Sequence, residues 1–130
     1  MWEAQGLEND DMLWAGTNFF GGMCRHREGV CGAVSAMAIS LGMMHRCPPG
    51  DDAAATTARE KARERTSALV QRFKDTHGSI VCRELLGITS MTDEEITRFF
   101  EEKRHSEQCS GYVRYIVEKL FEYGGRADGA

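Results

Sequence analysis

The stretch GVCGAVSAMAISLGMM, residues 29–44, decides the fold class that we expect for this chain. Its large apolar residues recur every three or four positions, as on one face of an α-helix, at Val34, Met37, Leu41 and Met44. A seam of small residues lies beside this stripe and would let another backbone approach closely, at Ala33, Ala36 and Ser40. We therefore predict a helix over residues 31–44, and the seam favours a homodimer.

The other apolar patterns in the chain are also helical, and no stretch alternates convincingly with the period of two that marks a strand. Further helices are predicted over residues 9–16, 53–76, 79–87 and 107–123, and a capping box at residues 92–95 opens one more. The segment FFGGM, residues 19–23, interrupts the pattern. We predict an all-α fold, a compact bundle of about five helices.

For two of the predicted helices the sequence also indicates the residues at which they begin or end. In the last helix, five apolar residues share one face and should point inward: Val113, Ile116, Val117, Leu120 and Phe121. Gly124 and Gly125 are expected to end this helix and to leave residues 124–130 as a loose tail. In the helix over residues 79–87, Ser79 is the expected N-cap and Gly87 the expected stop.

The composition indicates one soluble domain over residues 1–130. The formal charge of −4 argues against nucleic acid or an anionic membrane as the partner, because both select clustered Lys and Arg. The longest weakly polar run, residues 30–44, is too short to span a bilayer, which needs about 20 apolar residues. No secretory signal is visible in the first twelve residues. We therefore expect a cytoplasmic protein without membrane insertion.

Five cysteines are too few for a small disulfide scaffold, and in a reducing cytosol clustered cysteines serve metal or redox chemistry more often than static bridges. Helical phase turns Cys31, Cys82 and Cys109 inward, each near the start of its helix. The partial positive charge of a helix N-terminus stabilises a thiolate, the form that binds metals and attacks disulfides. The alternative for each is a buried cysteine that acts as a small hydrophobic residue.

The other two cysteines differ from these three. Cys24 lies in the loop GGMCRHREG, and the spacing CRHREGVC is not a recognised zinc pattern despite the interposed His26. Cys47 precedes Pro48 and Pro49 and is expected to be an exposed spare thiol.

Four segments together resemble one known family. The segments FFGGM, GVCGAVSAMAISLGM, GSIVCRELLGI and CSGYV are similar to the family named for its cysteine pattern, C_GCAxxG_C_C, over about residues 7–121. The resemblance matches Cys31 to the cysteine of the CGA motif, Cys82 to the cysteine before RELLG and Cys109 to the last cysteine. It implies a helical bundle with a redox role, and some relatives resemble iron–sulfur proteins.

The chain departs from the family pattern at two points. Ala36 replaces the final glycine of the motif, so two helices would approach slightly less closely there. The first cysteine of the pattern normally lies upstream of the segment GLENDD, so we expect an upstream family segment to be missing here. Cys24 is a candidate substitute for that cysteine.

Three functions remain open from the sequence. Cys31, Cys82 and Cys109, with Cys24 or a ligand from a partner chain, would hold an iron–sulfur cluster for electron transfer. Alternatively, the chain is a thiol–disulfide oxidoreductase in which Cys31 attacks and Cys82 or Cys109 resolves. A structural module fastened by zinc or a disulfide is the third reading. A redox role with an unidentified partner protein is favoured, with the first two alternatives nearly level.

Overall fold

The structure is a computed structural model that describes Gly6 and residues 9–127, with side chains described up to Gly124. Within those residues the chain forms helices and no strand, so the predicted all-α fold is confirmed. The elements are α1 (Asp11–Ala15), the 3-10 turn η2 (Thr17–Phe19), α2 (Phe20–Met23), α3 (Gly32–Met44), α4 (Asp52–His77), α5 (Cys82–Leu85), α6 (Asp93–Glu101) and α7 (Ser106–Ala127). None of these helices is long and apolar enough to cross a membrane.

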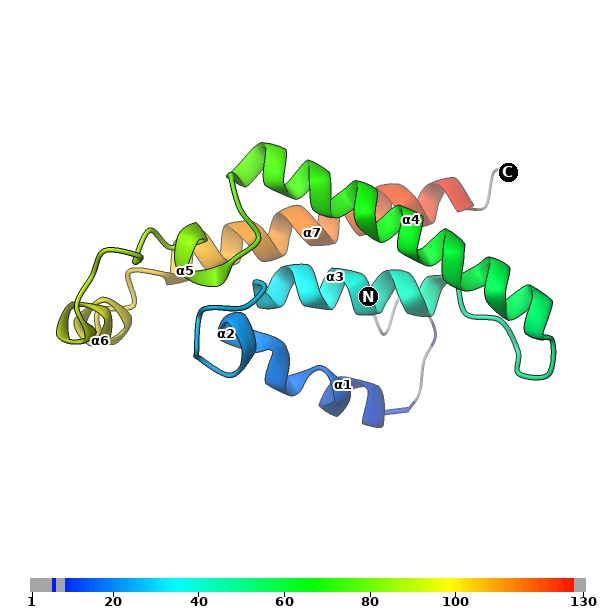
Figure 1. Cartoon of the computed structure of the whole chain (residues 1–130), viewed down its shortest axis with the longest axis horizontal. Coiled ribbons are helices and arrows are strands. Elements are labelled where there is room, and N and C mark those ends of the chain that lie inside the picture. Colours follow the sequence, from blue (N-terminus) through cyan, green and yellow to red (C-terminus); the bar gives the residue numbers. More distant parts are fainter. Residues whose placement is uncertain (1–5, 7–8, 128–130) are drawn as a thin grey trace.

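Helix α3 lies in the middle of the bundle (Figure 1). It packs against α4 and α7, and the α1–α2 segment covers another of its sides. Helices α3 and α7 begin at the same end of the molecule, and α5 lies at that end too, whereas α4 runs in the opposite direction (Figure 1). The N-terminal ends of α3, α5 and α7 therefore gather in one region.

The core consists of the apolar stripes that these helices turn toward one another. Its buried residues come from α3, α4, α5 and α7: Val34, Met37, Leu41, Leu69, Phe73, Leu85, Ile116 and Leu120. Full burial of one such side chain contributes about 1.5–3 kcal/mol of transfer free energy. The predicted stripe of α3 is confirmed for Val34, Met37 and Leu41, while Met44 is partly buried against the same cluster.

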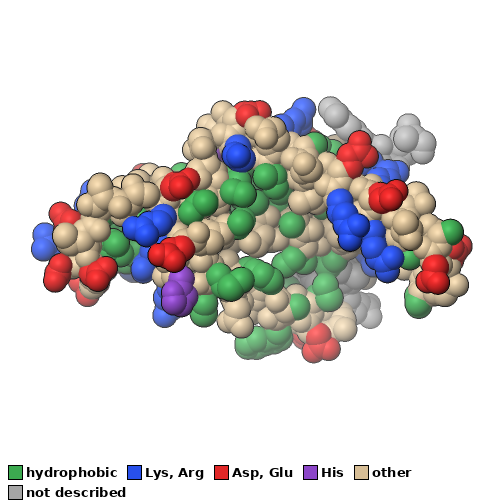
Figure 2. All heavy atoms as spheres, viewed as in Figure 1, with side chains coloured by type: hydrophobic (Ala, Val, Ile, Leu, Met, Phe, Trp, Pro, Cys, Tyr) green, Lys and Arg blue, Asp and Glu red, His purple; other side chains and the backbone are tan. Residues whose placement is uncertain are grey.

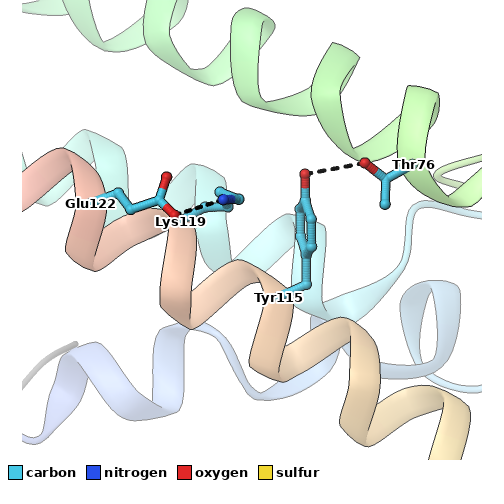
Figure 3. A network of polar contacts seen from close by, with 4 residues as sticks. All are labelled: Thr76, Tyr115, Lys119 and Glu122. Carbon is cyan, nitrogen blue, oxygen red and sulfur yellow. Dashed lines mark hydrogen bonds and ion pairs between the residues drawn. The ribbon is translucent and has the colours of Figure 1, made fainter.

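One polar contact joins α4 to α7, and a second lies within α7. The Tyr115 hydroxyl lies 3.3 Å from the Thr76 hydroxyl, which joins the two helices (Figure 3). One turn along α7, Lys119 forms an ion pair of 2.6 Å with Glu122 of the same helix (Figure 3). Charged side chains predominate toward the two ends of the face in Figure 2, and hydrophobic side chains gather near its middle.

Helix α7 differs from its prediction in two ways. It continues through Gly124 to Ala127, so the expected stop at Gly124 and Gly125 is wrong, and the rest of the predicted tail lies outside the described residues. Gly124 lies within this helix and does not have a positive φ. Three residues expected to face inward are exposed instead: Val113 (52%), Val117 (38%) and Phe121 (57%).

The short segments also correct one prediction and confirm another. Ser79 is not the N-cap of α5, because the helix starts at Cys82 and its N-cap is Val81. The Ser79 hydroxyl instead accepts a hydrogen bond from the Val81 amide. The predicted capping box is confirmed, since Thr92 accepts from the Glu95 amide and the Glu95 carboxylate accepts from the Thr92 amide.

Candidate functional site

Three of the five cysteines line one cavity. Cys31, Cys82 and Cys109 lie on the wall of a space of about 790 Å³ at the end of the molecule where their helices begin. Cys31 is the N-cap of α3, Cys82 is the first residue of α5, and Cys109 is in the first turn of α7. Cys82 is buried, and the other two are half-buried. The inward direction predicted for these three thiols therefore agrees with the structure.

An antiparallel β-bridge between Val30 and Val81 brings the first two thiols together. The Cys31 amide donates to the Ile80 carbonyl at 2.7 Å, and the Cys82 amide donates to the Gly29 carbonyl at 3.0 Å. Cys31 thus faces Ile80, and Cys82 is the diagonal neighbour on the same face, a relation that places residues about 7–8 Å apart.

The glycines of FFGGM allow a close approach to Cys82. Gly22 is buried and has a left-handed backbone with φ of +58°. A Cβ atom at Gly22 would lie 2.7 Å from the Cβ of Cys82 and 2.8 Å from the Gly29 carbonyl oxygen. Only glycine combines this backbone conformation with this contact. The interruption that the sequence predicts at residues 19–23 is therefore a packing surface for the thiol-bearing segment.

Burial controls the ionisation of two of the thiols. Burial, followed by the neighbouring Cys31 and Cys109, raises the pKa of Cys82 to about 11, and the nearby Arg27 opposes this rise with a smaller effect. Burial and Cys31 likewise raise the pKa of Cys109. These shifts oppose the expectation that the helix N-termini would favour the thiolate form of these two residues, because burial disfavours the charged form.

Cys24 and Cys47 stand apart from the three thiols. Cys24 is exposed, has a left-handed backbone, and does not line the cavity of Cys31. Its Sγ atom lies 4.0 Å from Oδ1 of Asn18. Cys47 is half-buried in a different hollow beside Pro48, which corrects the expectation of an exposed thiol.

The donor set does not fit an iron–sulfur cluster or a zinc ion as it stands. A cluster uses four thiolates, whereas only three thiols face this cavity and Cys24 lies elsewhere. In the described part of the chain, no three side chains of His, Cys, Asp or Glu are placed to hold one metal ion.

Several residues that sequence reasoning missed adjoin the thiols. Arg25, Arg27, Phe100 and His105 line the same cavity, and the Nδ1 atom of His105 is buried without a hydrogen-bond partner among the described residues. Tyr112 donates a hydrogen bond to the Leu85 carbonyl at 2.8 Å. The spacing of one helical turn between Tyr112 and Cys109 was the available signal for that tyrosine.

Burial, together with the three neighbouring thiols, raises the pKa of the Tyr112 hydroxyl. The phenol therefore stays protonated beside the cysteines and serves as a donor rather than as a base. Its hydrogen bond joins α7, which carries Cys109, to the end of α5, which carries Cys82.

Comparisons with known proteins agree with the cysteine pattern. A family model described as "Putative redox-active protein (C_GCAxxG_C_C)" matches residues 1–123. No curated protein and no solved structure matches the chain. Because the matched range covers most of the 130 residues, the chain belongs to the C_GCAxxG_C_C family.

Proposed function

We propose that this protein is a thiol–disulfide oxidoreductase that works through Cys31 with Cys82 or Cys109. The observation that carries the proposal is the single cavity lined by all three thiols. Cysteines from three separate helices share it, and the cavity has room for a substrate beside them. The alternative of cluster binding lacks a fourth thiol at this place.

Cys31 is the attacking residue in this proposal. It is the half-buried N-cap of the 13-residue helix α3, and its thiol lines the cavity where a substrate would lie. Cys82 and Cys109 have raised pKa values and suit the resolving role, in which a proton is lost only as the second step begins. The amide of Cys31 is fixed by its hydrogen bond to Ile80, which holds this residue beside Cys82.

The reaction transfers two electrons from the protein to an organic disulfide. The Cys31 thiolate attacks one sulfur, the substrate S–S bond breaks, and one substrate thiolate leaves with the proton that Cys31 lost. The resolving cysteine then loses its proton and attacks the mixed disulfide at Cys31. The second substrate thiolate leaves and takes that proton, and a protein disulfide remains. The reverse sequence oxidises a substrate dithiol.

A disulfide between Cys31 and Cys82 would need a small movement of the backbone. Diagonal partners at about 7–8 Å are slightly beyond the Cα separation that a disulfide allows. The segment over residues 24–31 is outside any helix and is the part able to supply this movement.

The test is a redox equilibrium under argon. The protein is incubated with glutathione and glutathione disulfide at a series of ratios, quenched in acid, alkylated and mapped by mass spectrometry. We expect an intramolecular disulfide between Cys31 and Cys82 or Cys109, which disappears in Cys31→Ser and persists in the matched control Cys47→Ser.

Two results would overturn the proposal. One is the absence of an intramolecular disulfide at every ratio, with only glutathione adducts formed. The other is a brown protein after anaerobic purification, with matching iron and sulfide contents that are lost in Cys31→Ser, Cys82→Ser and Cys109→Ser. That second result would assign the three thiols to an iron–sulfur cluster.

A further inference from the structure

The cavity beside the thiols has a charge pattern that selects its ligand. Its volume of about 790 Å³ is within the range of small-molecule sites, which is about 300–1,000 Å³. Most of its wall is apolar, including Phe20, Ala36, Phe100 and Val117, and none of the Asp and Glu residues in the described part of the chain lines it. Of the described residues that line the wall, Arg25 and Arg27 alone carry a permanent charge. A net-acidic protein thus contains a locally cationic, largely apolar site.

Both arginines are held by aromatic rings of the same wall. The Arg27 guanidinium lies over Phe100 at 4.0 Å from the ring centroid, and the Arg25 guanidinium lies over Phe20 at 5.3 Å. Stacking of this kind orients a guanidinium while leaving its N–H donors free for an anion.

Among the residues that the structure describes, no carboxylate neutralises these two arginines. The nearby Glu28 pairs with Arg83 at 3.6 Å, and neither Arg25 nor Arg27 forms an ion pair with any residue that the structure describes. Guanidinium groups in this state are ready to bind a carboxylate or another anion, often through two parallel hydrogen bonds.

The charged part of the cavity lies at one end, and the apolar part of its wall extends from there along the helices. Helices α3 and α7 begin at the same end of the molecule (Figure 1). Cys31 is the N-cap of α3, Cys109 is in the first turn of α7, and both arginines line the cavity with them. From Cys31 the wall continues along α3 to Ser40, a distance of about 13 Å at the helical rise per residue. Val113 and Val117 continue it along α7, and both are exposed. An elongated ligand would thus place its charged group near the thiols and its apolar body between the helices.

We propose that this cavity binds organic anions with an apolar body, and that the disulfide substrate belongs to this class, with Arg25 and Arg27 holding its anionic group. The inference rests on the proposed oxidoreductase function and names its substrate class. A second copy of the chain is a poorer occupant. In a twofold dimer the cavity wall would face the same wall of the second copy. The described residues of this wall contribute Arg25 and Arg27 and no carboxylate, so like charges would face each other.

The test compares two aromatic disulfides, dithiobis-nitrobenzoate, which is anionic, and dithiodipyridine, which is uncharged. The protein carries Cys24→Ser and Cys47→Ser, so that only the three cavity thiols react, and the second-order rate constants are measured by absorbance. Arg27→Gln and Arg25→Gln should each slow the reaction with the anion by about fivefold or more. Their reaction with the uncharged disulfide should change by less than about twofold. Arg72→Gln is the matched control, since it removes the same charge from an exposed site on α4.

A second measurement keeps binding separate from reaction and from folding. Dodecanoate, which cannot be reduced, should bind to the wild type by calorimetry, more weakly to Arg27→Gln, and not to Ala36→Phe, which fills the exposed apolar wall. Arg27→Lys should retain part of the affinity, and circular dichroism confirms that each variant folds.

Equal rate losses for both disulfides, or an equal loss in Arg72→Gln, would overturn the inference. So would self-association of the wild type that Ala36→Phe abolishes while dodecanoate fails to bind, since the groove would then belong to a second copy. If the protein disulfide forms with both reagents but no variant discriminates between them, the substrate class is wrong and the oxidoreductase function stands. If dodecanoate binding depends on Arg27 but no protein disulfide forms, the oxidoreductase function is wrong.

Discussion

Cys82 shows how burial at a single residue links the site to stability. A thiol is neutral when protonated, and the folded state raises its pKa from 9.0 to about 11. Below about pH 9 both the folded and the unfolded state keep the proton, so this contribution is constant. Between about pH 9 and pH 11 the unfolded state loses the proton first, which favours unfolding.

We therefore predict that the free energy of unfolding falls by about 2–3 kcal/mol over this pH range because of Cys82 alone. Urea titrations in reducing buffer measure it in the wild type and in Cys82→Ala. The wild type should lose more stability than the variant above about pH 9. If the free energy of unfolding depended on pH in the same way in both proteins, the pKa of Cys82 would not be raised by folding.

Gly22 is the residue whose replacement should disturb the site most directly. Gly22→Ala adds a Cβ only 2.7 Å from the Cβ of Cys82, at a backbone φ of +58°. We expect a loss of about 3 kcal/mol in the free energy of unfolding, from backbone strain and overpacking together. Gly87→Ala is the matched control, because its φ is +68° but no atom lies within 4 Å of the added carbon. It should cost about 1 kcal/mol. Equal costs would show that the contact with Cys82 is not tight.

The direction of each thiol was predictable, but its ionisation was not. Helical phase was enough to predict the inward direction of Cys82 and Cys109 and of Cys31, although Cys31 is the N-cap of α3 and lies just outside the helix. The pKa of Cys82 depends on how completely other segments bury it, and no pattern within SIVCRELLG encodes that.

At the scale of the elements, α7 gives a test of how far a glycine pair stops a helix. Gly124 has no positive φ, and the nearest atom to an added Cβ would be a methyl carbon of Met44 at 3.7 Å, an ordinary contact. We predict that Gly124→Ala stabilises the protein by about 0.5–1 kcal/mol, since alanine is the better helix former. Thermal unfolding measures the change. Gly78→Ala should do the opposite, because Gly78 ends α4 with φ of +86°.

The long helices were predictable because each carries its own signal. α3 and α4 begin and end within about two residues of their predicted bounds, and the Thr92 capping box encodes the start of α6 locally. α5 was predicted too long, because a segment of four helical residues takes its start from the neighbouring bridge at Val81 rather than from Ser79. The exposed face of α7, with Val113 and Val117, was predicted to be buried because periodicity shows that a face is apolar but not what covers it.

At the scale of the whole molecule, the site exists only through contacts between distant segments. The bridge joins only Val30 and Val81, which are more than 50 positions apart. A bridge of two single residues has no periodic pattern, so the sequence does not predict it. The arginines of the cavity reach it from a loop whose left-handed backbone at Arg25 and Arg27 has no sequence signature. The fold class was therefore readable from the sequence, whereas the convergence of the thiols with a cationic cavity required the tertiary structure.

Tyr112 is one of the contacts that hold α5, and with it Cys82, against the rest of the molecule. Helix α5 is too short to be stable alone, and the Tyr112 hydroxyl ties its Leu85 carbonyl to α7. Tyr112→Phe removes this bond, and local opening of α5 should become about 1 kcal/mol easier. The buried thiol of Cys82 should then be alkylated about fivefold faster under native conditions, as measured by mass spectrometry of the Cys82 peptide.

Tyr115→Phe is the matched control for this last prediction. Tyr115 is on the same helix and its ring also packs edge-on against Phe73, but its hydroxyl meets Thr76 of α4 instead of the thiol-bearing segment (Figure 3). Its loss should leave the alkylation rate of Cys82 unchanged within about twofold. If both variants accelerated alkylation equally, Cys82 would be exposed only by global unfolding. α5 would then open together with the rest of the bundle, not as a unit that Tyr112 holds closed.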